Sequence, residues 1–236
     1  SMKDVPADNG TDNLEIICWL KRETPRDALL SNSGLKFFEL PPGSIIGTSS
    51  IRRRAQILNL RNDLKINLLR GNVDTRIKKL RENSYDAIIL SLAGLKRLGL
   101  INEVTEELDE EHFLPAACQG TIGVQSKCGS NLKKVFGIIN HYETEIESIT
   151  ERKVLKDIKA NCNSPISVYA KTKNDILIIR CEIFDHDGFK IFSKIISDDK
   201  KRYLNLADKL VRAILEDVGQ DKINKLNNLD DFNYAP

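Results

Sequence analysis

Arginine side chains recur where short apolar segments of this chain give way to helical segments. In the stretch GTSSIRRR, residues 47–54, two serines and three arginines follow an apolar pair. More arginines follow the next two apolar runs, so that the set comprises Arg52, Arg53, Arg70, Arg76 and Arg97. A guanidinium group is a planar fork that binds a carboxylate or a phosphate through two hydrogen bonds. The repetition predicts a site for a ligand that carries several anionic groups.

The elements that must position these arginines alternate between strand and helix. Apolar runs at residues 44–47, 65–69 and 86–90 each precede a segment with helical periodicity. Three such units in succession predict an α/β fold with a parallel sheet and crossover helices. In such sheets ligands bind beyond the carboxyl ends of the strands, where helix N-termini offer free N–H groups. Ser50 and Asn72 are placed to cap two of these helices, beside the arginines.

The first arginines stand at an unfavourable end of their helix. With Ser49 or Ser50 as the N-cap, Arg52 and Arg53 fall in the first turn, where the helix macrodipole is positive. A cation there costs about 0.3–1 kcal/mol. An acidic ligand would offset this cost, so replacing Arg52 is expected to weaken ligand binding and to leave stability unchanged or slightly higher. The alternative interpretation is a solvated basic helix face, paired with surface carboxylates.

Composition excludes several classes of protein. Lys plus Arg is 36 and Asp plus Glu is 34, a net charge of +2, so there is no global excess of cations to favour nucleic acid as a partner. No apolar run reaches the ~18 residues of a membrane span, and no signal peptide opens the chain. The cysteines show no CxxC spacing and the histidines are isolated, so neither a disulfide framework nor a zinc site is expected. These residues are Cys18, Cys118, Cys128, Cys162, Cys181, His112, His141 and His186. We expect a reduced, intracellular protein without a metal site.

The last ninety residues change pattern. Segments 164–172, 175–184 and 189–197 are strand-like, and the last two are joined by DHDG, a hairpin signal. After these strands, the spacing of apolar residues predicts one amphipathic helix. Its apolar positions are Leu206, Leu210, Val211, Ile214 and Val218. These patterns predict a small C-terminal α+β domain that begins near Asn140. The preceding TIGVQ, residues 121–125, is also strand-like.

Eight motifs together resemble one known family. They are MKDVP (2–6), PRDALLS (25–31), GTSSIRRRAQ (47–56), LRGNVDTR (69–76), YDAIIL (85–90), AGLKRLG (93–99), LPAACQG (114–120) and NCNSPI (161–166). Their order and spacing are similar to those of porphobilinogen deaminase, also called hydroxymethylbilane synthase. The resemblance covers the chain from its first residues to the C-terminal helix, and the combination of motifs is highly specific.

The resemblance implies a transferase of heme and tetrapyrrole biosynthesis. This family joins four porphobilinogen molecules head to tail, with release of ammonia, to give linear hydroxymethylbilane. It carries a covalent dipyrromethane cofactor on a cysteine that matches Cys162, and its catalytic aspartate matches Asp4. The residues that bind carboxylates of the cofactor and substrate match Lys3, Ser50, Arg52, Arg53, Arg70, Arg76 and Arg97. A monomer without nucleic-acid or membrane partners is implied.

The residue types suit that chemistry. Porphobilinogen bears acetate and propionate groups, so a growing oligopyrrole is a polyanion that many arginine forks can bind. Loss of ammonia gives an electrophilic azafulvene cation, which a nearby carboxylate can stabilise. A thiolate is nucleophilic enough to anchor the cofactor. The chain departs from the family where Ala160 and Asn161 replace two glycines before the cysteine, where Asp74 replaces a common glycine, and where ACQG replaces the usual GQG context.

The implied fold has periplasmic-binding-protein-like sheet domains and a small C-terminal domain. We expect residues 1–25 and 115–139 to belong to the first domain, 26–114 to form the second α/β domain, and 140–236 to carry the cofactor cysteine. The family has a further segment before MKDVP, which we expect to be absent, separate or disordered, leaving the 121–125 strand without partners. A non-catalytic anion-binding module is therefore an alternative to the enzyme, and nucleic-acid binding a weaker one. The heme pathway places the protein in the cytoplasm or in a plastid.

Overall fold

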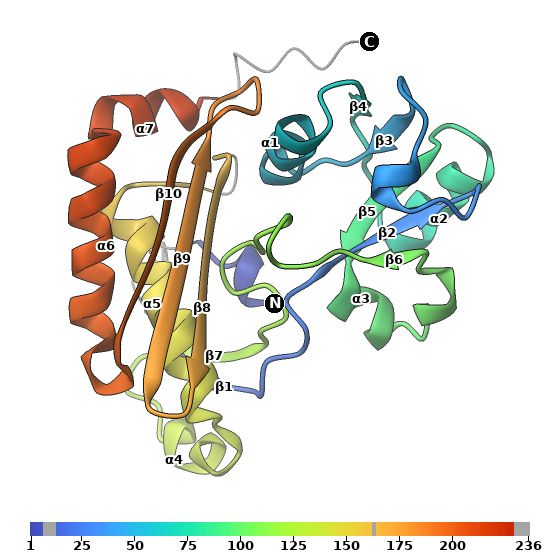
Figure 1. The fold of residues 1–236 in the computed structure, drawn as a ribbon. Helices are drawn as coiled ribbons and strands as arrows, with labels where there is room; N and C mark the ends of the chain where they lie inside the picture. The colour runs from blue at the N-terminus through green and yellow to red at the C-terminus, as the bar shows by residue number, and fades with distance from the viewer. Residues whose placement is uncertain (7–12, 162–163, 229–236) are drawn as a thin grey trace.

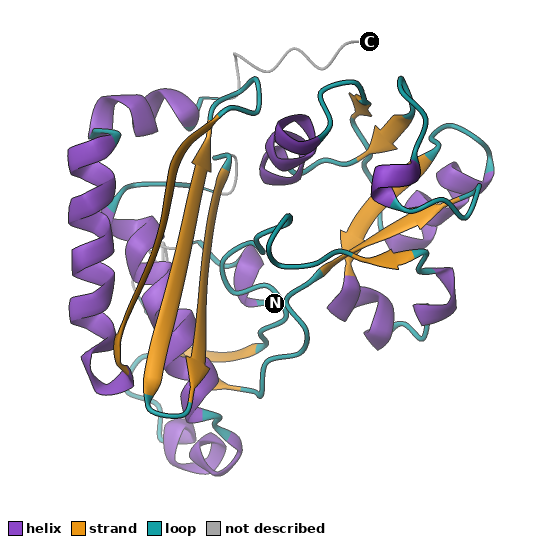
Figure 2. Ribbon diagram, in the orientation of Figure 1, coloured by secondary structure: helices purple, strands orange, loops and turns teal. Residues whose placement is uncertain are grey.

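The described residues form three separate β-sheets and the helices that cover them (Figures 1 and 2). A computed structural model describes residues 1–6, 13–161 and 164–228. The five-stranded sheet and its helices lie on one side, the three-stranded sheet and two long helices lie on the other, and the N-terminal segment lies between them (Figure 1). The fold is therefore a mixed α/β arrangement of several sheets.

The five-stranded sheet holds the β–α units that the sequence predicted. Its order is β4-β3-β5-β2-β6, with β3 parallel to both β4 and β5. The two remaining strands run antiparallel, so the sheet is mixed and the expectation of a parallel sheet holds only for its β3–β5 part. The strands are β2 (Asp27–Ser31), β3 (Ile45–Gly47), β4 (Lys65–Asn67), β5 (Ala87–Ser91) and β6 (Glu106–Glu107).

Side-chain alternation along the buried strands builds a core on each face of this sheet. Leu29 and Ile89 belong to one apolar cluster and Leu30 and Ile88 to the other, because successive strand residues point to opposite faces. The first cluster includes Ile57 of α1, and the second includes residues of α2 and α3. The elements of this region are α1 (Ile51–Leu60), α2 (Val73–Arg81), α3 (Leu92–Arg97), η2 (Phe37–Glu39) and η3 (Ile101–Glu103).

A two-stranded sheet corrects one expectation. The 121–125 strand is not left without a partner, because β7 (Gly123–Lys127) pairs antiparallel with β1 (Leu14–Trp19). The apolar run LEIICW that forms β1 had not been recognised as a strand. Beyond β7 the chain continues through α4 (Leu132–Phe136) and η4 (Gly137–Ile139).

The C-terminal part is a three-stranded antiparallel meander backed by helices. The predicted strands are present as β8 (Ile166–Lys173), β9 (Ile176–Phe184) and β10 (Lys190–Asp199), and Asp185 N donates to Phe189 O in the predicted hairpin. The long helices α5 and α6 share one apolar core with the sheet. The helical elements are α5 (Tyr142–Asp157), η5 (Lys200–Arg202), α6 (Tyr203–Asp217) and α7 (Gln220–Leu226).

Within the described residues, every helix is too short or too polar to cross a membrane.

Candidate active site between the sheet domain and helix α5

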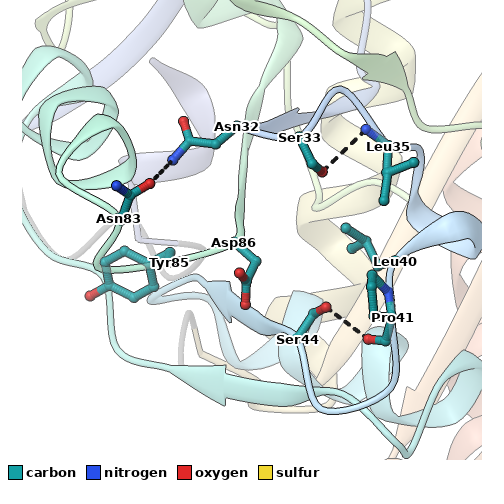
Figure 3. Close-up of a pocket in the computed structure, with 9 residues that line it drawn as sticks. All are labelled: Asn32, Ser33, Leu35, Leu40, Pro41, Ser44, Asn83, Tyr85 and Asp86. Carbon is teal, nitrogen blue, oxygen red and sulfur yellow. Dashed lines mark hydrogen bonds between the residues drawn. The ribbon is translucent and has the colours of Figure 1, made fainter.

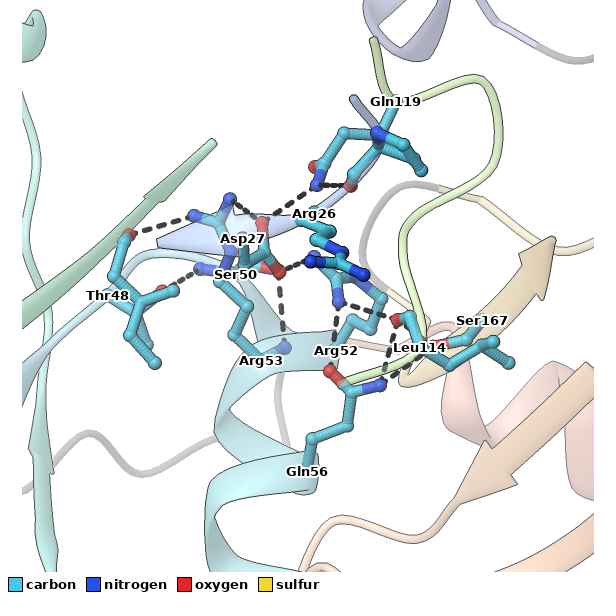
Figure 4. Close-up of polar contacts among 12 residues, drawn as sticks. Arg26, Asp27, Thr48, Ser50, Arg52, Arg53, Gln56, Leu114, Gln119 and Ser167 are labelled. Carbon is cyan, nitrogen blue, oxygen red and sulfur yellow. Dashed lines mark hydrogen bonds and ion pairs between the residues drawn. The ribbon is translucent and has the colours of Figure 1, made fainter. Parts of the chain in front are cut away.

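The arginines at the start of α1 have an internal counter-charge. Arg52 Nη2 donates to Asp27 Oδ2 at 2.8 Å, and Arg53 Nη2 donates to Asp27 Oδ1 at 2.7 Å (Figure 4). Asp27, the first residue of β2, is fully buried, and both arginines are nearly so. Ser50 is the N-cap, its Oγ accepting from Arg53 N at 3.4 Å. Asp27 therefore offsets these cations within the protein, and the further offset by an acidic ligand stays a prediction.

The charges of Asp27, Arg52 and Arg53 offset the cost of burying one another. Burial would raise the pKa of Asp27, but the charges of Arg53 and Arg52 and their hydrogen bonds hold it far below its usual range. Burial also lowers the pKa of Arg52, although Asp27 opposes this. Gln119 Nε2 adds a third hydrogen bond to Asp27, at 2.8 Å. The ion triad is therefore a buried unit in which each charge depends on the others.

The same cluster joins the five-stranded sheet to the C-terminal sheet. The carbonyl oxygen of Leu114 accepts from Arg52 Nη1 at 2.9 Å, from Gln56 Nε2 at 2.9 Å and from Ser167 Oγ at 3.1 Å. Gln56 Nε2 also lies 3.2 Å from Ser167 Oγ of β8 (Figure 4). The second nitrogen of the Arg53 fork donates to Ile89 O of β5. These bonds fix how α1 faces the three-stranded C-terminal sheet.

A large cavity lies beside this cluster. Its volume is about 890 Å³. Its wall is formed by the N-terminal segment, the start of α1, Arg76 of α2, the segment 116–119, and the end of α5 with the loop that leads to β8. Among the residues that line it are Lys3, Asp4, Ser49, Ser50, Arg52, Arg53, Arg76, Cys118, Gln119, Arg152, Lys156, Lys159, Ala160, Asn161 and Ser164. A cavity of this size can hold an oligomeric small molecule.

Asp4 reaches the cavity on a short segment held at both ends. It belongs to η1 (Met2–Asp4), whose Met2 is buried and donates its N–H to Thr121 O at 3.0 Å. On the other side, Arg152 of α5 donates to Val5 O at 2.9 Å and to Pro6 O at 2.6 Å. Helix α5 therefore sets where Asp4 stands.

Two further predicted cations line the cavity. Lys3 is exposed to water, but loss of part of its hydration lowers its pKa, and the charge of Arg53 lowers it to a smaller extent. Arg76 of α2 is half-buried, and its Nε donates to Gly71 O at 2.7 Å. Burial and then Arg53 lower the Arg76 pKa. An anion bound beside these groups would relieve their mutual repulsion.

The remaining predicted residues lie elsewhere or beyond description. Arg70 and Arg97 are exposed and are not among the described residues that line the cavity. Cys162 lies outside the described residues. The residues on either side of it, Asn161 and Ser164, line the cavity.

The sequence patterns did not predict a buried ion pair between Arg22 and Glu151. Arg22 Nη1 lies 2.7 Å from Glu151 Oε1, and Glu151, in the middle of α5, is fully buried. The same carboxylate accepts from Cys118 N at 2.5 Å and from Ala170 N at 2.7 Å. Burial lowers the pKa of Arg22, but the charge and hydrogen bond of Glu151 raise it by more, so the pKa lies above its usual value. No local pattern marks Arg22 or Glu151, because each is a single charge between ordinary neighbours.

Cys118 lines the cavity but is a poor nucleophile. It is buried, and burial together with the Glu151 charge raises the pKa of its thiol to about 12. Its φ is 58°, in the left-handed region that favours glycine, and it stands within the ACQG departure from the family pattern. Cys18, Cys118, Cys128 and Cys181, the cysteines that the structure describes, are all free.

A second, smaller cavity carries little charge. It measures about 180 Å³ and lies between the loop after β2 and the segment before β5 (Figure 3). Asp86 is the one charged side chain among its described lining residues, and its Oδ2 already accepts from Ile45 N at 2.7 Å. Ser44 Oγ likewise donates to Pro41 O. Its polar groups are thus engaged within the protein, and no described group of His, Cys, Asp or Glu could hold a metal ion.

The fold and the site are thus a mixed α/β arrangement with a large cavity whose wall contains several cationic side chains. Residues 1–134 match the family described as "Porphobilinogen deaminase, dipyromethane cofactor binding domain", and residues 145–216 match its C-terminal domain. The chain belongs to the porphobilinogen deaminase family. It is thus a transferase of tetrapyrrole biosynthesis with a dipyrromethane cofactor, and the non-catalytic alternative is not favoured.

Curated relatives support this assignment along most of the chain. The chain is 40% identical over 215 residues to the porphobilinogen deaminase of Clostridium kluyveri (strain NBRC 12016), covering 91% of this chain and 73% of the relative. It is 42% identical over 217 residues to that of Bacillus thuringiensis (strain Al Hakam), covering 90% and 70%. With that of Trichlorobacter lovleyi it shares 40% identity over 232 residues, covering 94% and 74%. These relatives are bacterial, so they give no support to a plastid location.

Proposed function

We propose that the large cavity is the catalytic site, where Asp4 acts on porphobilinogen beside a dipyrromethane group attached to Cys162. The observation that carries this proposal is that Asp4, the arginine cluster and the residues flanking position 162 all line one cavity. The reaction is the head-to-tail joining of four porphobilinogen molecules to hydroxymethylbilane.

The described residues fit the cofactor. Dipyrromethane built from two substrate molecules bears acetate and propionate groups, and the cavity wall contains several cations and the N-terminus of α1. When bound, the group supplies the pyrrole end to which substrate is added. Lys3, Ser50, Arg52, Arg53 and Arg76 are proposed to bind carboxylates there. For Arg70 and Arg97, which lie outside the cavity wall, the same role rests on the family pattern.

Asp4 is proposed to stabilise the positive charge that develops as substrate loses ammonia. The aminomethyl C–N bond of porphobilinogen breaks, ammonia leaves with the electron pair, and the remaining carbon becomes electrophilic. A carboxylate fixed near the pyrrole nitrogen lowers the energy of that cation. The pyrrole chain held at Cys162 would supply the free pyrrole carbon that bonds to this electrophile, and the proton displaced from that carbon would pass to solvent. Fixing Asp4 between Met2 and Arg152 keeps this carboxylate in place without rearrangement during the reaction.

The proposal extends to the organisation of the chain. We assign residues 1–25 and 115–139 to one domain, 26–114 to a second and 140–236 to a third. Each of these parts contains one of the three sheets, which supports the division. We further propose that the first two form a periplasmic-binding-protein-like pair around the cavity and that the enzyme works as a monomer.

Intact mass spectrometry tests the assignment of Cys162. The purified protein is expected to carry an adduct of two pyrrole units, and Cys162→Ser is expected to be folded and free of it. The matched control is Cys128→Ser, which removes an exposed free thiol and should retain the adduct. An adduct that persists on Cys162→Ser would refute the assignment.

A further inference from the structure

Two helices present opposite ends to the large cavity. Ser49 and Ser50 line it at the start of α1, whereas Lys156 and Lys159 line it at the end of α5. The N-terminal end of a helix carries partial positive charge and the C-terminal end partial negative charge. The α1 end therefore favours bound carboxylates, and the α5 end would repel them unless cations were added there.

Most of the arginine forks in the cavity wall are already used within the protein. Arg52 and Arg53 share Asp27, and Arg152 donates to two backbone carbonyls of the N-terminal segment. Lys156 and Lys159 differ from these arginines. Both side chains are exposed, and among the described residues neither ammonium group has a hydrogen-bond or ion-pair partner. Within the part of the chain that the structure describes, they are thus unpaired cations on the cavity wall.

The two lysines also stand beside the loop that leads to position 162. Helix α5 ends at Asp157, and Lys159 adopts a φ of 55° that turns the chain out of the helix. Ala160 N closes this turn on Leu155 O at 2.9 Å. Ala160 and Asn161, which follow, line the same cavity. Any carboxylate at this end of the cavity lies next to the negative end of α5 and to these two ammonium groups.

We propose that Lys156 and Lys159 form a carboxylate-binding subsite at the α5 end of the cavity, which holds acetate and propionate groups of the pyrrole chain. This inference rests on the proposed function of the cavity. The subsite supplies positive charge that the arginines paired with Asp27 do not, and it places that charge next to the negative end of α5. Lysine suits this role because its ammonium group is a flexible point charge that can follow a flexible carboxylate.

The competing interpretation is purely structural. Lysines near a helix C-terminus stabilise the helix through its macrodipole, whether or not a ligand is present. On that interpretation their removal would lower the thermal midpoint and leave ligand binding unchanged. The subsite predicts weaker binding in addition to any change in the midpoint, so affinity separates the two interpretations.

Equilibrium dialysis of porphobilinogen separates the two interpretations. The full chain with Cys162→Ser provides a protein without an adduct, to which Lys156→Gln and Lys159→Gln are added together. The control carries Lys133→Gln and Lys134→Gln, which make the same change in net charge on exposed residues of α4 outside the cavity wall. We expect about ten-fold weaker binding for the α5 pair, the size of one lost charge-assisted hydrogen bond, and a shallower salt dependence. The α4 pair should bind as its parent does.

A conservative variant completes the test. Lys156→Arg with Lys159→Arg retains both charges and should bind porphobilinogen within about two-fold of the parent, since the arginine fork also donates hydrogen bonds to a carboxylate. Affinity of the glutamine pair equal to that of the α4 control would overturn the subsite. If Cys162→Ser still carried an adduct, the Cys162 assignment would fail instead. The lysine pairs would then be compared by the same dialysis in the otherwise unchanged chain, so the two failures are distinguishable.

Discussion

Replacing Asp27 by Asn tests whether the buried ion triad stabilises the fold. Asp27 accepts hydrogen bonds from both Arg52 and Arg53 and is fully buried, so the amide leaves two guanidinium groups without a counter-charge. Breaking a buried ion pair in this way costs about 3–5 kcal/mol of unfolding free energy. For a chain of this length the thermal midpoint should fall by about 6–20 °C, which circular dichroism would measure.

The pH dependence of that effect gives a second, independent readout. The pKa of Asp27 in the folded protein lies far below its ordinary value of 3.8, so its contribution to stability is complete above pH 3.8 and is lost as pH falls below it. The stability difference between the parent and Asp27→Asn should therefore be constant at neutral pH and narrow below pH 3.8. A difference that stays constant through this range would refute the assignment of the charge to Asp27.

A surface pair and a double variant serve as controls. Asp63 pairs with Arg61 at 2.6 Å in a partly exposed position, so Asp63→Asn should change stability far less than Asp27→Asn does. Adding Arg52→Gln to Asp27→Asn removes one of the stranded charges, and the two changes together should cost less than the sum of each alone. Equal losses for Asp27→Asn and Asp63→Asn would show that the triad contributes no more than a surface pair. The earlier expectation that removing Arg52 spares stability is replaced by the expectation of a clear loss.

Changes at three further residues address Asp4 and the helix that holds its segment. Asp4→Asn should abolish turnover while the protein stays folded, and Asp4→Glu should retain a small rate, as steady-state assays would show; a more active Asn variant would exclude stabilisation of a cation. Arg152→Gln should lower kcat more than it changes KM and alter the fluorescence of Trp19, the single tryptophan, which packs with Met2; unchanged kinetics would remove its positioning role. Glu151→Gln should lower unfolding free energy by about 3–5 kcal/mol in urea titrations, because it strands a buried arginine, and a loss below 1 kcal/mol would contradict this.

Local signals in the sequence were sufficient for many elements. Ser50 and Asn72 cap their helices as predicted, Asn72 accepting from Thr75 N at 2.8 Å. The C-terminal strands and the hairpin at residues 185–188 were also confirmed, because apolar alternation and turn residues act over a few positions. These features depend on neighbours in sequence, which are visible in a single chain.

Long-range charge pairing could not be predicted in the same way. Asp27 lies 25 residues from Arg52 in sequence, and only the pairing of β2 with β5 brings it beneath α1. The residue type does not distinguish a buried aspartate from an exposed one, so the motif PRDALLS does not predict that Asp27 pairs with Arg52 and Arg53. The family resemblance supplied the candidates Asp4 and Cys162, and their roles remain proposals.

Helix α5 acts as a fixed spacer between two functional points. Arg152 holds the segment that carries Asp4, and the helix hands the chain to the loop before position 162 six residues later, at Ile158. At 1.5 Å per residue this separation is about 9 Å along one axis, and it cannot change without unwinding the helix. A product that lengthens by one ring at each cycle therefore cannot be accommodated by lengthening this part of α5. The added length must instead be accommodated elsewhere in the cavity, while the distance between the segment that carries Asp4 and the loop before position 162 stays constant.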